Sequence, residues 1–265
     1  MTDRQATPSP ALPPIQALVD LARRAGQVVL EIYNGFDGAS IRKQDGSPVT
    51  AADHAAEALI VPELRALMPG VPVVAEEQCA AQGVPPTAKC FWLVDPVDGT
   101  KEFLRRNGEF TVNIALVVDG VPVLGVVEAP AFDRRFWAAG GEAWQQQGDG
   151  TPQRIAVRHP PEGGMVVLTS RSHRDDPRLD AALADRHVAE RRVLGSSLKI
   201  VLIAAGEADL YLRFGPTMEW DTAAADAVLH AAGGRIDDPL TGHPLAYAKP
   251  GFANAGFIAR GATAA

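Results

Sequence analysis

The hydrophobic positions of the chain repeat at helical spacing in two early segments. In residues 15–33, Leu, Ala, Val and Ile recur every three or four positions, and residues 51–68 repeat this spacing with Leu and Ile. This periodicity predicts two amphipathic helices. Between the two segments, Asp45-Gly46 is typical of a hairpin turn. This part of the chain is therefore predicted to hold two helices separated by a short hairpin.

Apolar runs of strand length replace this pattern from residue 71 onward. Two pairs of runs are joined by Asp119-Gly120 and Gly140-Gly141, which predicts two hairpins. Residues 78–89 contain Gly and Pro and are predicted to be a loop. The two helices are therefore followed by a predicted antiparallel sheet. Its first strands are residues 71–75, 91–94, 110–118 and 121–127.

The pattern changes again near Thr151, where predicted strands begin to alternate with predicted helices. This alternation is typical of an α/β unit. We therefore expect an N-terminal α+β lobe, residues 1–152, and a C-terminal α/β lobe, residues 153–265. The expected strands of the second lobe are residues 165–169, 191–194, 209–214, 235–238 and 257–260, and its helices are residues 177–186, 196–205 and 223–232.

The apolar run 91–94 leads into Asp95-Pro96-Val97-Asp98-Gly99-Thr100. Pro96 cannot donate to a sheet ladder, so the strand is expected to end there. Two carboxylates three residues apart are costly to bury unless positive charge lies between them, and their oxygens suit Mg²⁺. Gly99 lets the backbone approach a ligand, and Thr100 can open a helix whose free N–H groups point at an anion. The motif predicts metal and phosphate binding; an Asp-rich surface turn is the alternative.

Other acids stand at similar places, and each also has a structural explanation. Glu76 and Glu77 follow the strand 71–75, where a solvated surface pair is the alternative. Asp53 lies three residues after Thr50, as the acid of a capping box would. Asp221 precedes an Ala-rich helix that it could cap. Taken singly, none of these acids identifies a site.

Composition narrows the class of protein. The 265 residues are 46% hydrophobic and 22% charged, which is ordinary for a globular protein, and the net charge of −7 argues against a surface that coats nucleic acid. Cys79 and Cys90 have neither the spacing of a zinc site nor that of a disulfide framework, which indicates reduced thiols in a cytoplasmic protein. No apolar run reaches the roughly 18 residues of a membrane span, and the N-terminal segment lacks the apolar core of a secretory signal.

Three acidic segments occur in a fixed order over nearly the whole chain. They are Glu76-Glu77, then the segment from Asp95 to Thr100, then Trp220-Asp221 with the Ala-rich helix closed by Gly233-Gly234. This combination resembles the inositol monophosphatase superfamily of Mg²⁺-dependent, lithium-sensitive phosphatases. Within it, the chain is most similar to the CysQ-type 3′(2′),5′-bisphosphate nucleotidases. The residues that carry this finer resemblance are 45–53, 100–103, 107–113, 170–173, 195–199 and 213–217.

The resemblance implies an α-β-α-β-α layered sandwich with the active site between the lobes. It also implies hydrolysis of 3′-phosphoadenosine 5′-phosphate to AMP and phosphate, a step that clears a product of sulfate assimilation. Two alternatives stay open: a phosphatase of the same superfamily that acts on an inositol, histidinol or sugar phosphate, and a phosphate-binding protein without turnover. Ala225 departs from the pattern, because the family usually has Gly there.

The resemblance also implies roles for individual residues. With two or three Mg²⁺ ions, Glu76, Asp95 and the Val97 carbonyl would hold one, and Asp95, Asp98 and Asp221 a second. Thr100, with Asp53 or Glu76, would orient the attacking water. The expected substrate-binding residues are Gly99, Thr100, Ser196, Lys199, Arg213 and Asp221, of which Lys199 and Arg213 would pair with the second phosphate; ordinary solvated charges are the alternative for these two.

The expected partner is a small phosphorylated nucleotide, not a nucleic-acid polymer. The resemblance is compatible with a homodimer. It is also compatible with peripheral association with the bacterial inner membrane, although nothing in the composition supports or excludes such an association.

Overall fold

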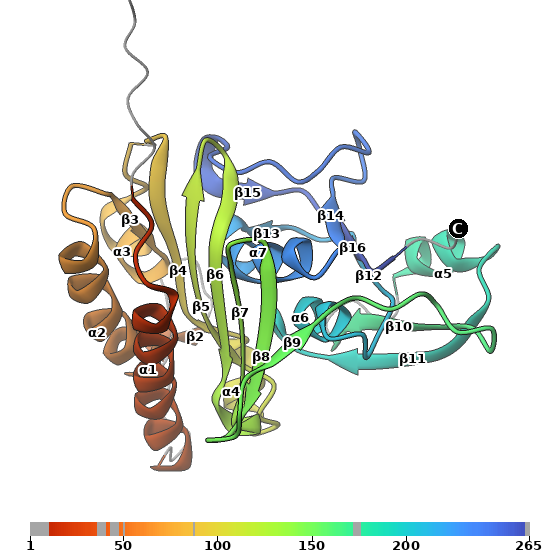
Figure 1. Cartoon of the computed structure of the whole chain (residues 1–265), viewed down its shortest axis with the longest axis horizontal. Coiled ribbons are helices and arrows are strands. Elements are labelled where there is room, and N and C mark those ends of the chain that lie inside the picture. The colour runs from red at the N-terminus through yellow and green to blue at the C-terminus, as the bar shows by residue number, and fades with distance from the viewer. Residues whose placement is uncertain are drawn as a thin grey trace, which may run out of the picture.

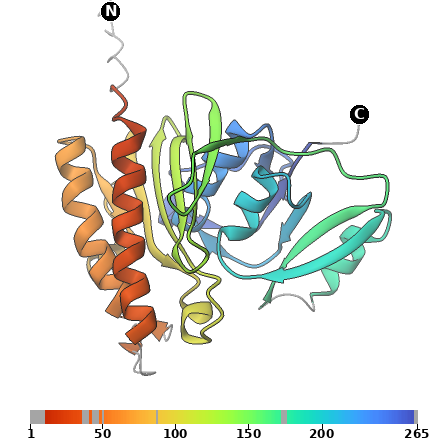
Figure 2. The same cartoon turned by 60° about the horizontal axis from the view of Figure 1, so that its bottom comes forward.

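A computed structural model describes residues 11–35, 41–42, 48–49, 51–86, 88–171 and 176–262. These residues form five layers: two long helices, a seven-stranded sheet, two helices, a five-stranded sheet and a short outer helix (Figure 1). The layers confirm the predicted α-β-α-β-α sandwich. Figure 2 shows the same order from a second direction, with the long helices outside the first sheet.

The outer helices are α1 (Ile15–Gly35) and α2 (Ala51–Leu67), as the apolar spacing predicts. Their apolar faces pack on each other and on the first sheet, which buries one of the two main cores. Between them, β1 (Ile41–Arg42) pairs antiparallel with β2 (Pro48–Val49). The predicted turn at Asp45-Gly46 and the predicted cap at Thr50 lie outside the described residues.

The first sheet has the order β3-β4-β5-β6-β7-β8-β9. Strand β3 is parallel to β4, and every other neighbouring pair is antiparallel. Both predicted hairpins are present. The strands are β3 (Val73–Ala75), β4 (Cys90–Asp98), β5 (Thr111–Val118), β6 (Val121–Ala129), β7 (Arg134–Ala139), β8 (Glu142–Gln147) and β9 (Gln153–Ile155).

Strand β4 continues through Pro96 to Asp98, so the prediction that Pro96 ends the strand is wrong. The register between β4 and β5 shifts between Asp95 and Asp98. A missing N–H costs little at such an irregularity, because no ladder bond is needed there. The same shift carries both aspartates to the end of the sheet.

Helix α3 (Glu76–Gln82) follows β3 directly. The predicted loop over residues 78–89 is therefore wrong at its start. The residues of α3 are good helix formers, and Gly and Pro occur only from Gly83 onward. The helix matters for the site because Glu76 is its first residue.

The second half alternates strands and helices, as predicted. Helices α6 (Leu198–Ala204) and α7 (Ala223–Ala231) lie between the sheets, and α5 (Pro177–Leu183) covers the far face of the second sheet. That sheet has the order β11-β10-β12-β16-β14. Its strands are β10 (Met165–Ser170), β11 (Val188–Leu194), β12 (Leu210–Arg213), β14 (Arg235–Asp237) and β16 (Phe257–Arg260).

The two halves pack closely through α7 and the first sheet. A Cβ atom at Gly125 of β6 would lie 2.3 Å from the carbonyl oxygen of Ala224, so only glycine allows this approach. Ala225, where the resemblance leads one to expect Gly, is fully buried in the same core. The division into lobes at residue 152 stays a prediction; β9 extends the first sheet slightly past it.

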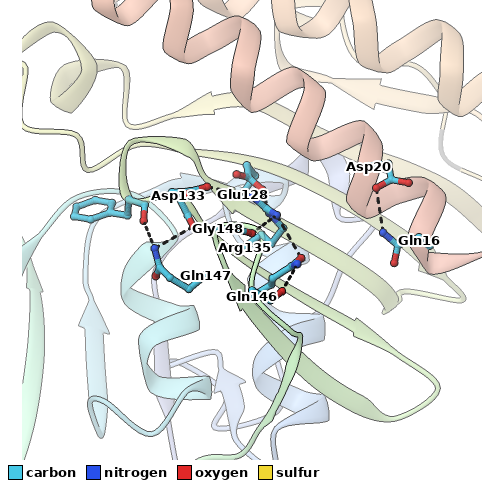
Figure 3. A network of polar contacts seen from close by, with 10 residues as sticks. Gln16, Asp20, Glu128, Asp133, Arg135, Gln146, Gln147 and Gly148 are labelled. Atoms are coloured by element: carbon cyan, nitrogen blue, oxygen red, sulfur yellow. Dashed lines mark hydrogen bonds and ion pairs between the residues drawn. The ribbon is translucent and has the colours of Figure 1, made fainter.

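A buried ion pair lies in the first sheet, away from the acidic motifs. Arg135 of β7 donates from Nε to Glu128 Oε2 of β6 at 3.0 Å and from Nη1 to the carbonyl of Gly148 at 3.0 Å (Figure 3). Asp133 Oδ1 accepts from the same guanidinium at 3.3 Å. Gly26 of α1 packs against Glu128, where a Cβ would lie 2.7 Å from Cγ. Burial raises the pKa of Glu128 to about 7, and the Arg135 guanidinium opposes that rise.

Candidate active site

Asp95 and Asp98 lie at the irregular end of β4, and each accepts a hydrogen bond from a backbone N–H group. Asp95 is 1% exposed, and its Oδ1 accepts a hydrogen bond from the N–H of Val97 at 3.0 Å. Asp98 Oδ2 accepts from the N–H of Ser197 at 2.5 Å. The end of a central strand therefore holds both acids in place.

Gly99 makes the turn from β4 into α4 (Thr100–Leu104). Its φ is +96°, and a Cβ there would lie 2.9 Å from the carbonyl oxygen of Glu109. Both facts require glycine. Thr100 opens α4 as predicted, and its Oγ1 donates to the carbonyl oxygen of Val97 at 3.3 Å. The turn therefore fixes the backbone between the acids and the helix.

The predicted acids Asp53, Glu76 and Glu77 come from two other helices. Glu76 and Glu77 are the first residues of α3, and Asp53 lies in the first turn of α2, almost fully buried. Glu77 is also buried, so the surface-pair alternative is wrong for it. These elements flank β3 and β4.

Asp221 ends the short helix η3 (Glu219–Asp221), which follows β13 (Thr217–Met218). Its carboxylate accepts from the N–H of Met218 at 2.9 Å. Thr222, not Asp221, occupies the N-cap position of α7. The alternative in which Asp221 merely caps the Ala-rich helix is therefore wrong.

These acids lie close enough to raise one another's pKa values. Burial raises the pKa of Asp95 well above its usual range, and the charges of Glu76, Asp98, Asp221 and Asp53 raise it further. Burial, then Asp98 and Glu76, raises the pKa of Asp221 in the same way. Carboxylates from four segments thus share one buried region.

Asp98 differs because a cation faces it. Burial raises its pKa to about 6, while Lys199 and the N–H of Ser197 oppose that rise. Within the described residues, no three His, Cys, Asp or Glu side chains form a ready-made metal cluster. Asp95, Asp98 and Asp221 each accept a backbone hydrogen bond instead.

The donor set nevertheless fits a hard divalent cation. The four acids Glu76, Asp95, Asp98 and Asp221 offer oxygen ligands, and burial of several like charges is costly without positive charge among them. The assignment of individual ligands stays a prediction.

A cavity opens beside Asp98 and Asp221. It is also lined by Gly99, Ser196, Lys199 and Arg213. The lining of the cavity therefore combines acids with cations, a combination that suits a phosphate ester with more than one charged group.

Lys199 is buried, with 3% of its surface exposed, so it is not an ordinary solvated charge. Its Nζ donates to the carbonyl oxygens of Ser196 at 2.6 Å and Leu194 at 3.2 Å, and it lies 5.0 Å above the ring of Tyr211. Burial lowers the pKa of Lys199 to about 8, against the effect of Asp98. Arg213 donates from Nη1 to Ser170 Oγ at 3.2 Å.

The loop before α6 joins the two halves at the site. Ser197 Oγ donates to Asn113 Oδ1 of β5 at 2.8 Å, in addition to its backbone bond to Asp98. Glu109 accepts from the N–H of Gly195 and from Arg171 Nη2, both at 2.8 Å. Sequence reasoning placed Ser197 beside Ser196 at a helix start that could help to bind the second phosphate, but it gave neither Asn113 nor Glu109 a site role. Both lie in segments that carry the family resemblance, which was the available signal.

Glu57 was also missed. It lies in α2, one helical turn after Asp53, and accepts hydrogen bonds from the N–H groups of Glu77 at 2.8 Å and Gln78 at 2.9 Å. Burial raises its pKa to about 7, while the N–H of Glu77 opposes the rise. The signal available in the sequence was its i, i+4 spacing from Asp53, which places both acids on one helix face.

The model of the inositol monophosphatase family matches residues 13–264. This chain belongs to the inositol monophosphatase family. Its enzymes are metal-dependent phosphatases. The site agrees with this membership, since the acids that the family resemblance predicts lie close enough to raise one another's pKa values.

Relatives are similar over nearly the whole chain. The 3′(2′),5′-bisphosphate nucleotidase CysQ of Salmonella typhimurium is 47% identical over 92% of this chain and 98% of its own length. The corresponding nucleotidase of Buchnera aphidicola is 40% identical over 92% of each chain.

Solved structures agree with the fold. CysQ of Bacteroides thetaiotaomicron, at 36% identity, has a TM-score of 0.78 over 93% of this chain and 96% of its own. An inositol monophosphatase of Thermotoga maritima, at 26% identity, has a TM-score of 0.74 over 93% and 91%. Both free thiols, Cys79 and Cys90, are unbridged as predicted, and none of the helices in the described part of the chain could cross a membrane.

Proposed function

We propose that this protein is a Mg²⁺-dependent 3′(2′),5′-bisphosphate nucleotidase that converts 3′-phosphoadenosine 5′-phosphate to AMP and phosphate. The single observation that carries the proposal is the cavity, whose lining combines the acids Asp98 and Asp221 with the cations Lys199 and Arg213. A substrate with two phosphates needs both kinds of surface. The 47% identity to a nucleotidase of this activity supports the choice of substrate.

The metal ligands would be Glu76, Asp95, Asp98, Asp221 and the carbonyl of Val97. Glu76, Asp95 and the Val97 carbonyl would share one ion, and Asp95, Asp98 and Asp221 a second, with two or three ions in all. When bound, Mg²⁺ neutralises the phosphate, activates a water and stabilises the leaving oxygen.

The chain itself would place the scissile phosphate at the start of α4. The N–H groups of Gly99 and Thr100 would donate to its oxygens. The Thr100 hydroxyl would orient the attacking water, and the carboxylate of Asp53 or Glu76 would accept its proton. The position of Gly99 in the lining of the cavity supports this role.

The second phosphate would lie against Lys199, Arg213 and Ser196. Lys199 offers a buried point charge, and Arg213 offers a planar fork suited to phosphate. Burial strengthens such pairing because fewer water molecules compete. A monophosphate such as inositol 1-phosphate would offer these cations no second phosphate to bind.

The test is phosphate release from 3′-phosphoadenosine 5′-phosphate and from inositol 1-phosphate, measured side by side with Mg²⁺ and with added Li⁺. We expect strong preference for the nucleotide and suppression by Li⁺. Preference for inositol phosphate would keep the metal chemistry and reject the nucleotide. Binding of the nucleotide without any phosphate release would identify a binding protein instead.

A further inference from the structure

Helix α3 lacks a local cap at the residue where it begins. Ala75, at its N-cap position, is extended and has no side chain that can accept a hydrogen bond. Helix starts leave backbone N–H groups unpaired unless another group accepts from them. Here that acceptor comes from a different helix.

Glu57 of α2 supplies both acceptor atoms. Its Oε2 accepts from the N–H of Glu77 at 2.8 Å, and its Oε1 accepts from the N–H of Gln78 at 2.9 Å. The carboxylate is 5% exposed, so solvent can replace these bonds only poorly. One buried carboxylate thus holds two consecutive peptide groups directly after Glu76.

The length of α3 makes this contact important. The helix spans Glu76–Gln82, about two turns, and a helix this short has little stability of its own. Its first residue therefore takes its orientation from what the following peptide groups contact. On the other side of Glu76, the backbone is fixed by the pairing of β3 with β4.

We propose that Glu57 is a positioning residue that fixes the start of α3 and thereby aims the Glu76 carboxylate at the metal. The inference rests on the proposed role of Glu76 as a ligand. Groups that orient metal ligands typically contribute tenfold to a hundredfold to metal affinity. Glu57 makes no direct contact with the metal in this scheme; it acts through the backbone of its two hydrogen-bond donors.

The experiment uses Glu57→Gln, Glu57→Ala, Glu76→Gln and a matched control, Glu63→Gln. Glu63 lies on the same helix, but its partner is Arg24 on the outer surface. Mg²⁺ binding is measured by calorimetry without substrate, at a temperature where circular dichroism shows every variant folded. Hydrogen exchange of α3 is measured in metal-free protein, so that helix anchoring is followed separately from catalysis.

We expect Glu57→Ala to bind Mg²⁺ about tenfold to a hundredfold more weakly and to exchange the amides of Glu77 and Gln78 faster. Glu57→Gln should lose less, because its single amide oxygen still accepts one of the two bonds. Saturating Mg²⁺ should restore kcat with the KM for substrate unchanged. Glu63→Gln should match the wild type in every measurement.

Faster exchange in both Glu57 variants with wild-type Mg²⁺ affinity would overturn the proposal, because Glu57 would then support the helix alone. Unchanged exchange would overturn it as well. Wild-type affinity in Glu76→Gln would instead remove Glu76 from the ligands, so that result counts against the proposed site itself. The two failures are therefore distinguishable.

Discussion

The first sheet buries carboxylates at two places, and the two differ in what neutralises them. Glu128 of β6 meets the guanidinium of Arg135 at 3.0 Å, and further acceptors surround that cation. Asp95 of β4 is equally buried, but its charged neighbours are other acids. A buried charge that lacks a protein counter-ion is costly, so a sequence that keeps several of them together indicates an external cation.

The largest expected effect comes from changing one acid of the cluster around Asp95. Asp98→Asn should lower turnover about a thousandfold, because several kcal/mol of metal-dependent stabilisation are lost. The amide oxygen can still accept from Ser197, so the fold should persist. The measurement is phosphate release at several Mg²⁺ concentrations, with urea unfolding as a check of the fold. Full activity at low Mg²⁺ would contradict the ligand assignment.

Breaking the pair between Glu128 and Arg135 should lower stability and leave turnover nearly unchanged. Arg135→Met would leave Glu128 buried without its cation and should cost about 3–5 kcal/mol of folding free energy. Turnover at temperatures where the variant is folded should stay near wild type, since the pair lies away from the cavity. Urea unfolding and phosphate assays test both statements. Adding Glu128→Gln should recover part of the loss; a double variant as unstable as the single one would speak against the pairing argument.

A third buried acid, Asp226 of α7, has a neutral partner and should make the folding stability depend on pH. Tyr247 donates to its Oδ2 at 2.8 Å, and burial raises the pKa of Asp226 to about 7. The folded state therefore keeps a proton that the unfolded chain releases near pH 4, so this contribution to stability is lost as pH rises through about 7.

Asp226→Asn removes that dependence. At pH 8 the variant should be more stable than wild type by about 3 kcal/mol, and the difference should shrink toward pH 4. Urea unfolding over this pH range is the measurement, with exposed Asp149→Asn as control. A difference that does not change with pH would exclude titration of Asp226 as its source.

The smallest expected effect concerns the backbone between the site acids and α4. Gly99→Ala and Gly141→Ala both place a Cβ at positive φ, but only the first meets another atom, the carbonyl of Glu109. Gly141→Ala should cost about 1 kcal/mol, and Gly99→Ala more, with a raised substrate KM. Thermal unfolding and steady-state kinetics compare the two. Equal losses would mean that close packing at Gly99 is unimportant.

The acids at the ends of β3 and β4 could be predicted because their positions follow from short sequence motifs. Asp95 and Asp98 share one motif, and Glu76 follows an apolar strand. What could not be predicted depends on contacts between distant segments. The bond from Glu57 to Gln78 joins two helices, and the pairing of β4 with β5 decides that the strand passes Pro96.

Asp221 illustrates the same limit. Sequence spacing places it before an Ala-rich helix, where capping is the simplest explanation. Its true position in η3 depends on β13, which pairs with the distant strand β15 (Ala253–Asn254). Local propensity does not predict this pairing, because it depends on the tertiary packing of distant segments.

The short contact between Asp98 and the N–H of Ser197 has a consequence for motion. The two halves of the molecule meet at an acid that we propose as a metal ligand. A movement that separates the halves at this point would break the hydrogen bond to Asp98. Loss of this contact would therefore reduce activity even if each half kept its fold.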